Sequence, residues 1–331
     1  MALSSMILAD ATGAEIRLIH DELDLELGPA ENSFEIRVPY TAWQGDMADH
    51  CRVYIPGTEY GGIILEHASS SLERIVTVKG YTWRGMLQHY IIEPPAGEAY
   101  RYVSGDLNAC IYDLVGAQFD GLFSVSQELT GVSVTNYRIP RYVTALEAIS
   151  RLLADNDYKL RIRYLQTASS GYVLLEAVPL VDHSEEVEMS SDGRINFVVT
   201  DCKRGVNHLI CLGKGDLAAR TVVHLYAGQN GTISHTKYYT GINEIAEVYD
   251  NNNAELDDLI EAGTKRLKDI MNYQSYKASA GNSDDIDIDI GDIISGRDFI
   301  SGTYVSKPIE KKVLKIKRGK VTVEYGLEGE T

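Results

Sequence analysis

The sequence lacks the motifs of common metal centres and nucleophilic enzymes. Its four cysteines, Cys51, Cys110, Cys202 and Cys211, form no C-x-x-C pair, and its eight histidines contain no H-E-x-x-H motif. This spacing gives no support to a zinc site and indicates reduced, mostly buried thiols of a protein made in a cytoplasm. A G-x-S-x-G nucleophile elbow is also absent. We therefore expect no cofactor, no metal site and no catalytic residues.

Two catalytic alternatives need separate treatment. His50 precedes Cys51, but neighbouring residues on a strand point to opposite faces, which argues against a cysteine–histidine pair. The 48 acidic residues supply carboxylate pairs by number alone, so a pair of the kind that cleaves glycosides stays open.

Basic residues and long apolar runs are also in short supply. Lysine and arginine total 31 against 48 acidic residues, which gives a formal net charge of -17. Proteins that bind nucleic acid through its phosphates carry basic patches, so we expect no specific nucleic-acid binding, although DNA passing by is compatible with this charge. No apolar run approaches the ~20 residues that span a bilayer, and the N-terminus has no basic region followed by an apolar core. We expect no membrane insertion and no signal peptide.

Phenylalanine is scarce, with 5 residues, whereas tyrosine is abundant, with 21. Tyrosine suits half-buried strand surfaces and subunit interfaces, where one end of the ring stays wet. Both interpretations carry equal weight at this point. The length of 331 residues, 44% of them hydrophobic, predicts two or three domains with a substantial core.

Residues 1–97 have the pattern of a β domain. Apolar and polar side chains alternate over residues 15–20 and 33–38, and the same alternation continues over 63–66 and 75–78. The run Pro94-Pro95-Ala96-Gly97 then ends the pattern and predicts a domain boundary.

Residues 98–190 change to mixed α and β patterns. Apolar residues follow helical spacing from Asp106 onward, and Thr144 with Glu147 forms a capping-box pattern that predicts a second helix. Leu160, Ile162 and Tyr164 then alternate with charged residues as in a strand. We predict a small α+β domain here, inserted between two β domains.

Residues 191–331 return to strand patterns, with one helix predicted at about 253–272. Gly213, Gly215 and Ala218 stand in G-x-G-x-x-A spacing, as in a dinucleotide-binding turn. The residues from Thr221 to Tyr226 are already β-branched and apolar, which leaves no room for the crossover helix that such a turn opens. We therefore predict a β-hairpin over 206–226, and a two-residue turn at Asn230 and Gly231.

Two charged runs lie near the end of the chain. Strict alternation over 284–290 predicts a solvated acidic strand face with Asp285, Asp287 and Asp289, and the alternative is a cation site other than an EF-hand. A basic run interrupted by apolar residues predicts a strand pair with one exposed basic side. Its residues are candidates for a subunit interface, the alternative being a solvated edge strand. They are Lys311, Lys312, Lys315, Lys317, Arg318 and Lys320.

Three blocks of the sequence resemble bacteriophage tail hub proteins of the siphovirus type, which are related to contractile-tail baseplate hubs. They are residues 52–95, beginning RVYIPGTEYGG, residues 213–226, GKGDLAARTVVHLY, and residues 289–326, beginning DIGDIISGRDF. The resemblance implies an α+β, mainly β chain in which two tube-type β-barrel domains flank the small α+β domain. It also implies a homotrimer whose ring joins the tail tube to the tip or spike.

The same resemblance implies the setting in which the chain works. Its partners would be copies of itself, a distal tail or tube protein, the tape-measure protein and a spike or tip protein, in a virion tail or tail-like particle assembled in the bacterial host cytoplasm. Because the sequence supplies no oriented nucleophile–base pair, we expect that the chain is not an enzyme. The net charge of -17 predicts a ring with a neutral to acidic lumen and with the basic run directed away from it. The alternatives are a tail-associated cell-wall hydrolase and a carbohydrate-binding β-protein.

Overall fold

The protein is described from a computed structural model that covers residues 6–116, 118–167, 170–184, 195–202, 204–228, 231–281, 288–297 and 304–327. Strands predominate among these residues, and their pairings are antiparallel except for β10 with β14 and β16 with β19. The predicted α+β, mainly β class is therefore confirmed.

The strands of the first half are β1 (Met6–Ala9), β2 (Glu15–Ile19), β3 (Glu22–Leu27), β4 (Ser33–Pro39), β5 (Arg52–Tyr54), β6 (Gly61–Ser70), β7 (Ile75–Thr82), β8 (Ile91–Ile92), β9 (Arg101–Asp106), β10 (Phe123–Val125), β11 (Ser133–Ile139), β12 (Val143–Thr144), β13 (Tyr158–Gln166) and β14 (Gly171–Pro179). Those of the second half are β15 (Ile195–Cys202), β16 (His208–Leu212), β17 (Val222–Ala227), β18 (Ile233–Ser234), β19 (Ala246–Asp250), β20 (Tyr273–Gly281), β21 (Ile293–Arg297), β22 (Tyr304–Lys317) and β23 (Lys320–Leu327). The α-helices are α1 (Trp83–Gln88), α2 (Leu107–Val115), α3 (Ala145–Ala154) and α4 (Leu256–Ile270). None of these described helices is long and apolar enough to cross a membrane.

The chain folds into two compact units. The first unit is built from the chain up to Phe197 and again from Ala278, and the second is built from Val198–Lys277. The chain leaves the first unit within β15 and returns to it within β20. The three domains predicted from the sequence remain a prediction, since sharing one compact unit does not decide how many domains it contains.

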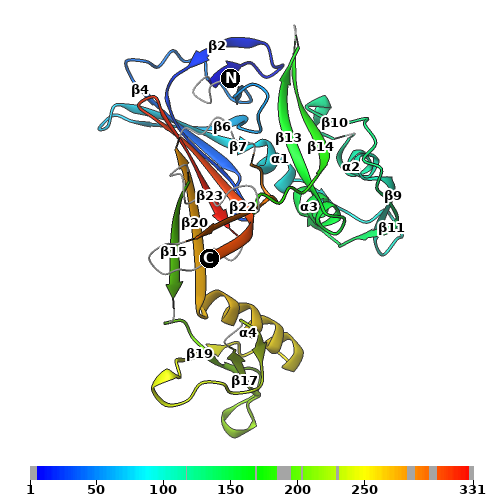
Figure 1. Cartoon of the computed structure of the whole chain (residues 1–331), viewed down its shortest axis with the longest axis vertical. Coiled ribbons are helices and arrows are strands. Elements are labelled where there is room, and N and C mark those ends of the chain that lie inside the picture. The colour runs from blue at the N-terminus through cyan, green and yellow to red at the C-terminus, as the bar shows by residue number, and fades with distance from the viewer. Residues whose placement is uncertain are drawn as a thin grey trace. The chain divides into compact units, whose positions relative to one another are not determined.

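A 12-stranded sheet organises the first unit, in the order β15-β20-β23-β22-β3-β4-β7-β6-β5-β1-β2, with β21 paired to β22 (Figure 1). In β4 the predicted alternation is present, because Phe34, Ile36 and Val38 are buried while the residues between them are more exposed. The order also places the C-terminal strand β22 beside β3, with Leu314 opposite Leu25. Among the described residues this order is an open path rather than a closed ring of strands.

Two glycines permit the close approach of β6 and β7. A Cβ atom on Gly80 would lie 1.8 Å from the carbonyl oxygen of Ile63, and one on Gly62 would lie 2.1 Å from that of Tyr81. Both obstacles are backbone atoms inside a sheet, which cannot move without breaking the strand pairing. These positions therefore require glycine for steric reasons.

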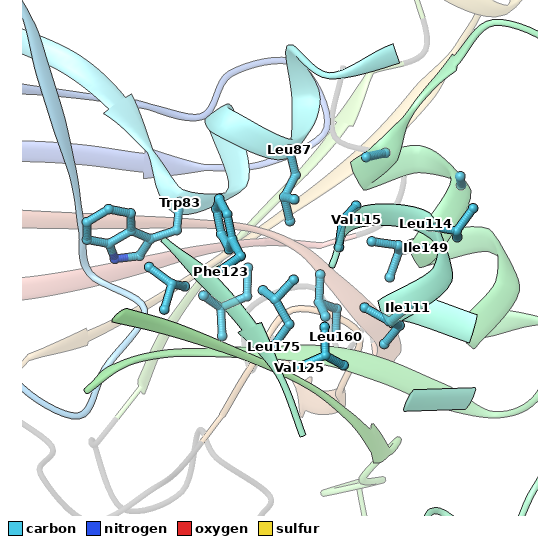
Figure 2. Close-up of a cluster of buried hydrophobic side chains, with 14 of the residues drawn as sticks. Trp83, Leu87, Ile111, Leu114, Val115, Phe123, Val125, Ile149, Leu160 and Leu175 are labelled. Atoms are coloured by element: carbon cyan, nitrogen blue, oxygen red, sulfur yellow. The ribbon is translucent and has the colours of Figure 1, made fainter. Parts of the chain in front are cut away.

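Two capped helices pack on the β13–β14 hairpin, to one side of the large sheet (Figure 1). The Asp106 side chain caps α2 by accepting a hydrogen bond from the Asn108 N–H at 3.0 Å, and Thr144 caps α3 through the Glu147 N–H at 3.1 Å. Both predicted helices are thereby confirmed. Their apolar faces share a core with β10, β13 and β14 (Figure 2). Its buried members include Leu107, Ile111, Leu114, Val115, Phe123, Val125, Ile149, Leu152, Leu160 and Leu175.

Aromatic packing connects this helical part to the large sheet. The ring of Tyr164 from β13 lies 3.9 Å, centroid to centroid, from Tyr54 of β5 and 5.2 Å from Trp83 of α1. All three side chains are fully buried. Large rings in contact bury much apolar area, so this group holds the two parts of the first unit in one core.

The second unit is a four-stranded sheet, in the order β18-β17-β16-β19, packed on α4. Its core contains Leu209 and Cys211 of β16 and Leu259 and Leu267 of α4. The predicted hairpin over 206–226 is confirmed, because β16 and β17 pair antiparallel. The predicted helix is also confirmed, over Leu256–Ile270. Of the predicted turn, Asn230 lies outside the described residues.

Candidate subunit interface

The six basic residues predicted at a subunit interface all lie on the β22–β23 hairpin. The strands are joined by Arg318 and Gly319, whose φ angles are 51° and 74°. Two consecutive residues with positive φ match the right-handed twist of a tight antiparallel hairpin, and glycine takes this conformation at no steric cost. The predicted strand pair is therefore confirmed.

Five of these residues keep their charged groups at least partly exposed. The ammonium of Lys311 lies 2.7 Å from Glu26 Oε1, and that of Lys315 lies 2.9 Å from Glu324 Oε2. Lys317, Arg318 and Lys320 are exposed at the tip of the hairpin. Partly exposed ion pairs such as those of Lys311 and Lys315 contribute little to stability. The tip therefore presents three basic side chains to solvent.

Lys312 differs from the prediction because its side chain is buried. Only 4% of the residue is exposed, and its Nζ atom lies 2.9 Å from Asp289 Oδ1 and 3.1 Å from Glu59 Oε1. Lys312 alternates in phase with Leu314 and Ile316, which are both buried, and it lies opposite Leu27 on the core side of the sheet. Its ammonium is used inside its own chain and is not available to a neighbouring subunit.

Lys312 belongs to a buried ion-pair network. On one side Glu59 also accepts a hydrogen bond from Arg84 Nε at 2.9 Å, and Arg84 donates through Nη2 to the Leu160 carbonyl at 3.1 Å. On the other side Lys159 Nζ lies 2.5 Å from Asp292 Oδ2 and 3.8 Å from Asp289 Oδ2.

The charges of this network balance, because it contains the cations Arg84, Lys159 and Lys312 and the carboxylates Glu59, Asp289 and Asp292. Asp292 is fully buried and also accepts hydrogen bonds from the backbone N–H groups of Val181 and Asp289, at 3.0 and 2.8 Å. Charges this deep are tolerated only when paired and hydrogen-bonded. The network joins β13, α1 and β22, so it fixes the helical part of the first unit against the sheet.

Opposite charges dominate the protonation behaviour of the network. Burial alone would raise the pKa of Asp289, but Lys312, Lys159 and Arg84 lower it to about 2. Burial alone would lower the pKa of Lys312, but Tyr60, Glu59 and Asp289 hold it well above its usual value. Both groups therefore stay charged across the neutral range.

The predicted solvated acidic strand face is wrong at Asp289. Residues 288–292 form a turn rather than a strand, and Ile288 is buried. The turn directs Asp289 and Asp292 toward Lys312 and Lys159 because the buried ammonium groups require anionic partners. The acidic residues Asp284, Asp285 and Asp287 lie outside the described residues. Within the described part of the chain, no group of acidic, histidine or cysteine side chains is arranged to hold a metal ion.

The large sheet carries an acidic surface over β3, β4, β6 and β7. A cavity of 610 Å³ is lined by residues of β3, β4, β6 and β7 and the turn before β4. Five of these residues are carboxylates, namely Asp24, Glu26, Glu31, Glu35 and Glu66, while Lys79 is the basic residue that lines it. Lys311 reaches this same acidic side through Glu26. Lys311 of β22 therefore lies next to acidic side chains and not on a separate basic surface.

The described cysteines are buried and unpaired. Cys51, Cys110 and Cys211 are free thiols, and burial raises the pKa of Cys110 and Cys211. His50 is exposed whereas Cys51 is buried, which agrees with the prediction that these neighbours do not cooperate. The side chain of Cys202 lies outside the description.

Comparison with known proteins identifies the fold. No protein-family model and no curated protein matches the chain. The 43 kDa tail protein of prophage MuSo2 from Shewanella oneidensis aligns over 98% of this chain and 98% of its own, with 14% sequence identity and a TM-score of 0.52. The fold is that of a phage tail protein. The resemblance to tail hub proteins predicted from the sequence is thus confirmed at the level of the fold.

Two other solved structures align over almost the whole tail-protein fold. Prophage tail protein gp18 from Listeria monocytogenes EGD-e has 11% identity and a TM-score of 0.45, covering 99% of this chain and 96% of its own. A chain of the phage P2 baseplate in its activated conformation has 10% identity and a TM-score of 0.48, covering 99% of both chains.

Proposed function

We propose that the protein is a structural hub of a phage tail or phage-tail-like particle, which forms a ring joining the tail tube to the tip or spike. The observation that carries this proposal is the alignment with the MuSo2 tail protein over 98% of both chains. A match of that extent involves both compact units rather than one common domain. Fold alone does not define function, so the proposal needs an assembly test.

The finer architecture belongs to the same proposal. The sheet strands of residues 1–97 and 191–331 would form two tube-type β-barrel domains around the inserted α+β part, and three copies would close a ring. The edge strand β2 supports this, because among the described strands it pairs only with β1. Its residues Ile16 and Leu18 are 45% and 53% exposed. Open edges with apolar side chains are normally covered by a neighbour.

The acidic and basic surfaces suggest how the ring is arranged. The five carboxylates beside β3 and β4 suit the wall of a passage, because anionic side chains repel a polyanion within about 10 Å at 0.1 M salt. Lys317, Arg318 and Lys320 at the hairpin tip would contact an acidic neighbouring subunit. The partners would be a distal tail or tube protein, the tape-measure protein and a spike or tip protein, in a virion tail assembled in the host cytoplasm.

We infer a scaffolding role without catalysis. Asp289 lines a cavity of 540 Å³, but its carboxylate is neutralised by Lys312 and Lys159, and its pKa of about 2 makes it a poor proton donor or acceptor at neutral pH. A cell-wall hydrolase would release fragments from purified peptidoglycan, and a carbohydrate-binding protein would bind a glycan array. Either result with the purified chain would replace the hub proposal.

Light scattering of the purified full chain tests the ring, with three copies per particle expected at micromolar concentration. The variant K317E/R318E/K320E is expected to dissociate it, whereas the control R74E/K265E/K268E changes the same charge at other exposed positions and leaves it intact. A monomeric wild-type chain within isolated tails would contradict the hub. Equal dissociation of both variants would contradict the role of the hairpin tip.

A further inference from the structure

Three arginines converge on a cavity in the α+β part of the first unit. The cavity has a volume of 530 Å³ and lies between β11, the turn that follows it and the end of α3. Its lining is Tyr100, Tyr137, Arg138, Pro140, Arg141, Arg151 and Asp155. The lining carries three cations and one carboxylate in a chain whose net charge is -17.

These arginines have no carboxylate partner within the part of the chain that the structure describes. Half-buried arginines elsewhere in the first unit do have one, as Arg17 does with Asp46 at 2.6 Å and Arg101 with Asp113 at 3.3 Å. Acidic residues outnumber basic ones in this sequence, so three neighbouring unpaired guanidinium groups are unexpected. All three are exposed, so solvent screens their mutual repulsion, and their donors are accessible to an anion from outside.

Aromatic rings leave the hydrogen-bonding edges of two of these arginines available. The guanidinium of Arg138 lies over the ring of Tyr100, 4.9 Å from its centroid, and that of Arg141 lies 5.4 Å from the centroid of Tyr142. A ring covers the flat face of a guanidinium, whereas the N–H donors point outward in its plane. Both side chains are therefore oriented to donate paired hydrogen bonds to a carboxylate.

The acidic residue in the lining is already engaged. Asp155 accepts a hydrogen bond from the Tyr137 hydroxyl at 2.5 Å. Burial, and then this bond to Asp155, raises the pKa of Tyr137 to about 12, so the phenol stays a donor. Asp155 is thus held by Tyr137 and forms no ion pair with the arginines.

We propose that this cavity binds an acidic polypeptide segment of a partner protein, whose carboxylates pair with Arg138, Arg141 and Arg151. Arginine and tyrosine are the side chains enriched where protein partners bind tightly, and Pro140 adds an apolar surface between them. The site lies apart from the β22–β23 hairpin in the sequence and does not depend on the proposed ring.

The surroundings favour spaced carboxylates over one compact dianion such as phosphate. Arg151 lies in the last turn of α3, and Asp155 is its C-cap. The C-terminus of a helix carries partial negative charge, and together with Asp155 it repels a dianion placed centrally in the cavity. A polypeptide distributes its carboxylates and reaches each guanidinium separately.

Fluorescence anisotropy with a fluorescein-labelled deca-glutamate peptide tests the proposal on the full chain at low salt. The variant R138Q/R141Q/R151Q is expected to weaken binding at least about tenfold, because each charge-assisted pair contributes more than an ordinary hydrogen bond. The control R74Q/R204Q/K265Q removes the same charge from exposed positions and is expected to change the affinity less than twofold. Thermal melting checks that both variants are folded.

Two further measurements distinguish this proposal from its alternatives. Substituting the three arginines by lysine keeps the charge but not the planar donors, so we expect intermediate affinity. Inorganic tripolyphosphate should displace the peptide only at much higher concentration than unlabelled deca-glutamate. Absence of peptide binding, equal losses in the variant and the control, or preferential binding of tripolyphosphate would each overturn the proposal.

Discussion

The Nζ atom of Lys312 lies 2.9 Å from Oδ1 of Asp289, so two residues that the charge pattern assigns to exposed surfaces neutralise each other within the first unit. The contact joins β22 to the turn before β21. Lys312 also pairs with Glu59, so one buried cation on β22 holds two carboxylates from other parts of the first unit.

Removing Lys312 is expected to destabilise the first unit strongly. In K312M the carboxylates of Glu59 and Asp289 lose their shared cation while remaining largely buried, which should lower the free energy of unfolding by about 3–5 kcal/mol. Urea denaturation measures the change. The exposed control K265M is expected to stay within about 0.5 kcal/mol of wild type, and a K312M chain as stable as this control would contradict the network.

Asp289 is expected to contribute to acid sensitivity. Its pKa is about 2 in the folded chain against an ordinary value of 3.8, so its stabilisation is complete above pH 3.8 and is lost as the pH falls toward 2. The difference between the two values corresponds to about 2 kcal/mol. The variant D289N lacks this pH-dependent contribution. The difference in free energy of unfolding between wild type and D289N should therefore shrink as the pH falls from 4 to 2. A difference independent of pH would rule out this titration.

Replacing Gly80 by alanine is expected to prevent stable pairing of β6 with β7. The added methyl would lie 1.8 Å from the Ile63 carbonyl oxygen, a backbone atom that cannot yield. We expect a loss above about 4 kcal/mol or an insoluble chain. G28A is a suitable control, because its Cβ would meet the flexible Lys311 side chain at 3.4 Å. Circular dichroism melting of both variants makes the comparison.

The cap of α3 is expected to contribute modestly. T144A removes the oxygen that accepts the Glu147 N–H, which should lower stability by about 1 kcal/mol. T144S keeps that oxygen and should behave nearly as wild type. If both variants melt alike, the capping bond is not the cause of any loss.

Local patterns predicted α2, α3, α4 and several strands, because capping residues and apolar spacing act over a few neighbouring residues. The helices beginning after Asp106 and Thr144 and the hairpin of β16 with β17 are examples. Helix α1 was missed, because residues 1–97 were predicted to contain only strands and turns. The pairing of β22 with β3 could not be predicted in this way. Alternation shows which side of a strand is buried, but it does not identify the strand next to it.

The candidate interface was predicted only in part for the same reason. The basic run does form an exposed hairpin, yet Lys312 alternates in phase with Leu314 and Ile316 and so lies on their buried face. The sequence shows this alternation but not which carboxylates make a buried lysine possible there. The other members of the buried network around Lys312 were not predicted, because isolated charged residues such as Glu59 and Lys159 usually have solvated side chains. Arg84 gave the one available signal, since it follows Trp83 in an apolar stretch.

The pairing of β22 with β3 also determines when the sheet of the first unit can be completed during synthesis. Leu25 of β3 leaves the ribosome long before Leu314 of β22, because more than twenty structural elements separate β3 from β22 along the chain. Until then one edge of β3 lacks its neighbour, and an open edge of alternating leucines invites pairing with other nascent chains. The sheet of the first unit is therefore completed only after β22 has been synthesised, and shortened chains that end before β22 would be the aggregation-prone species in the cell.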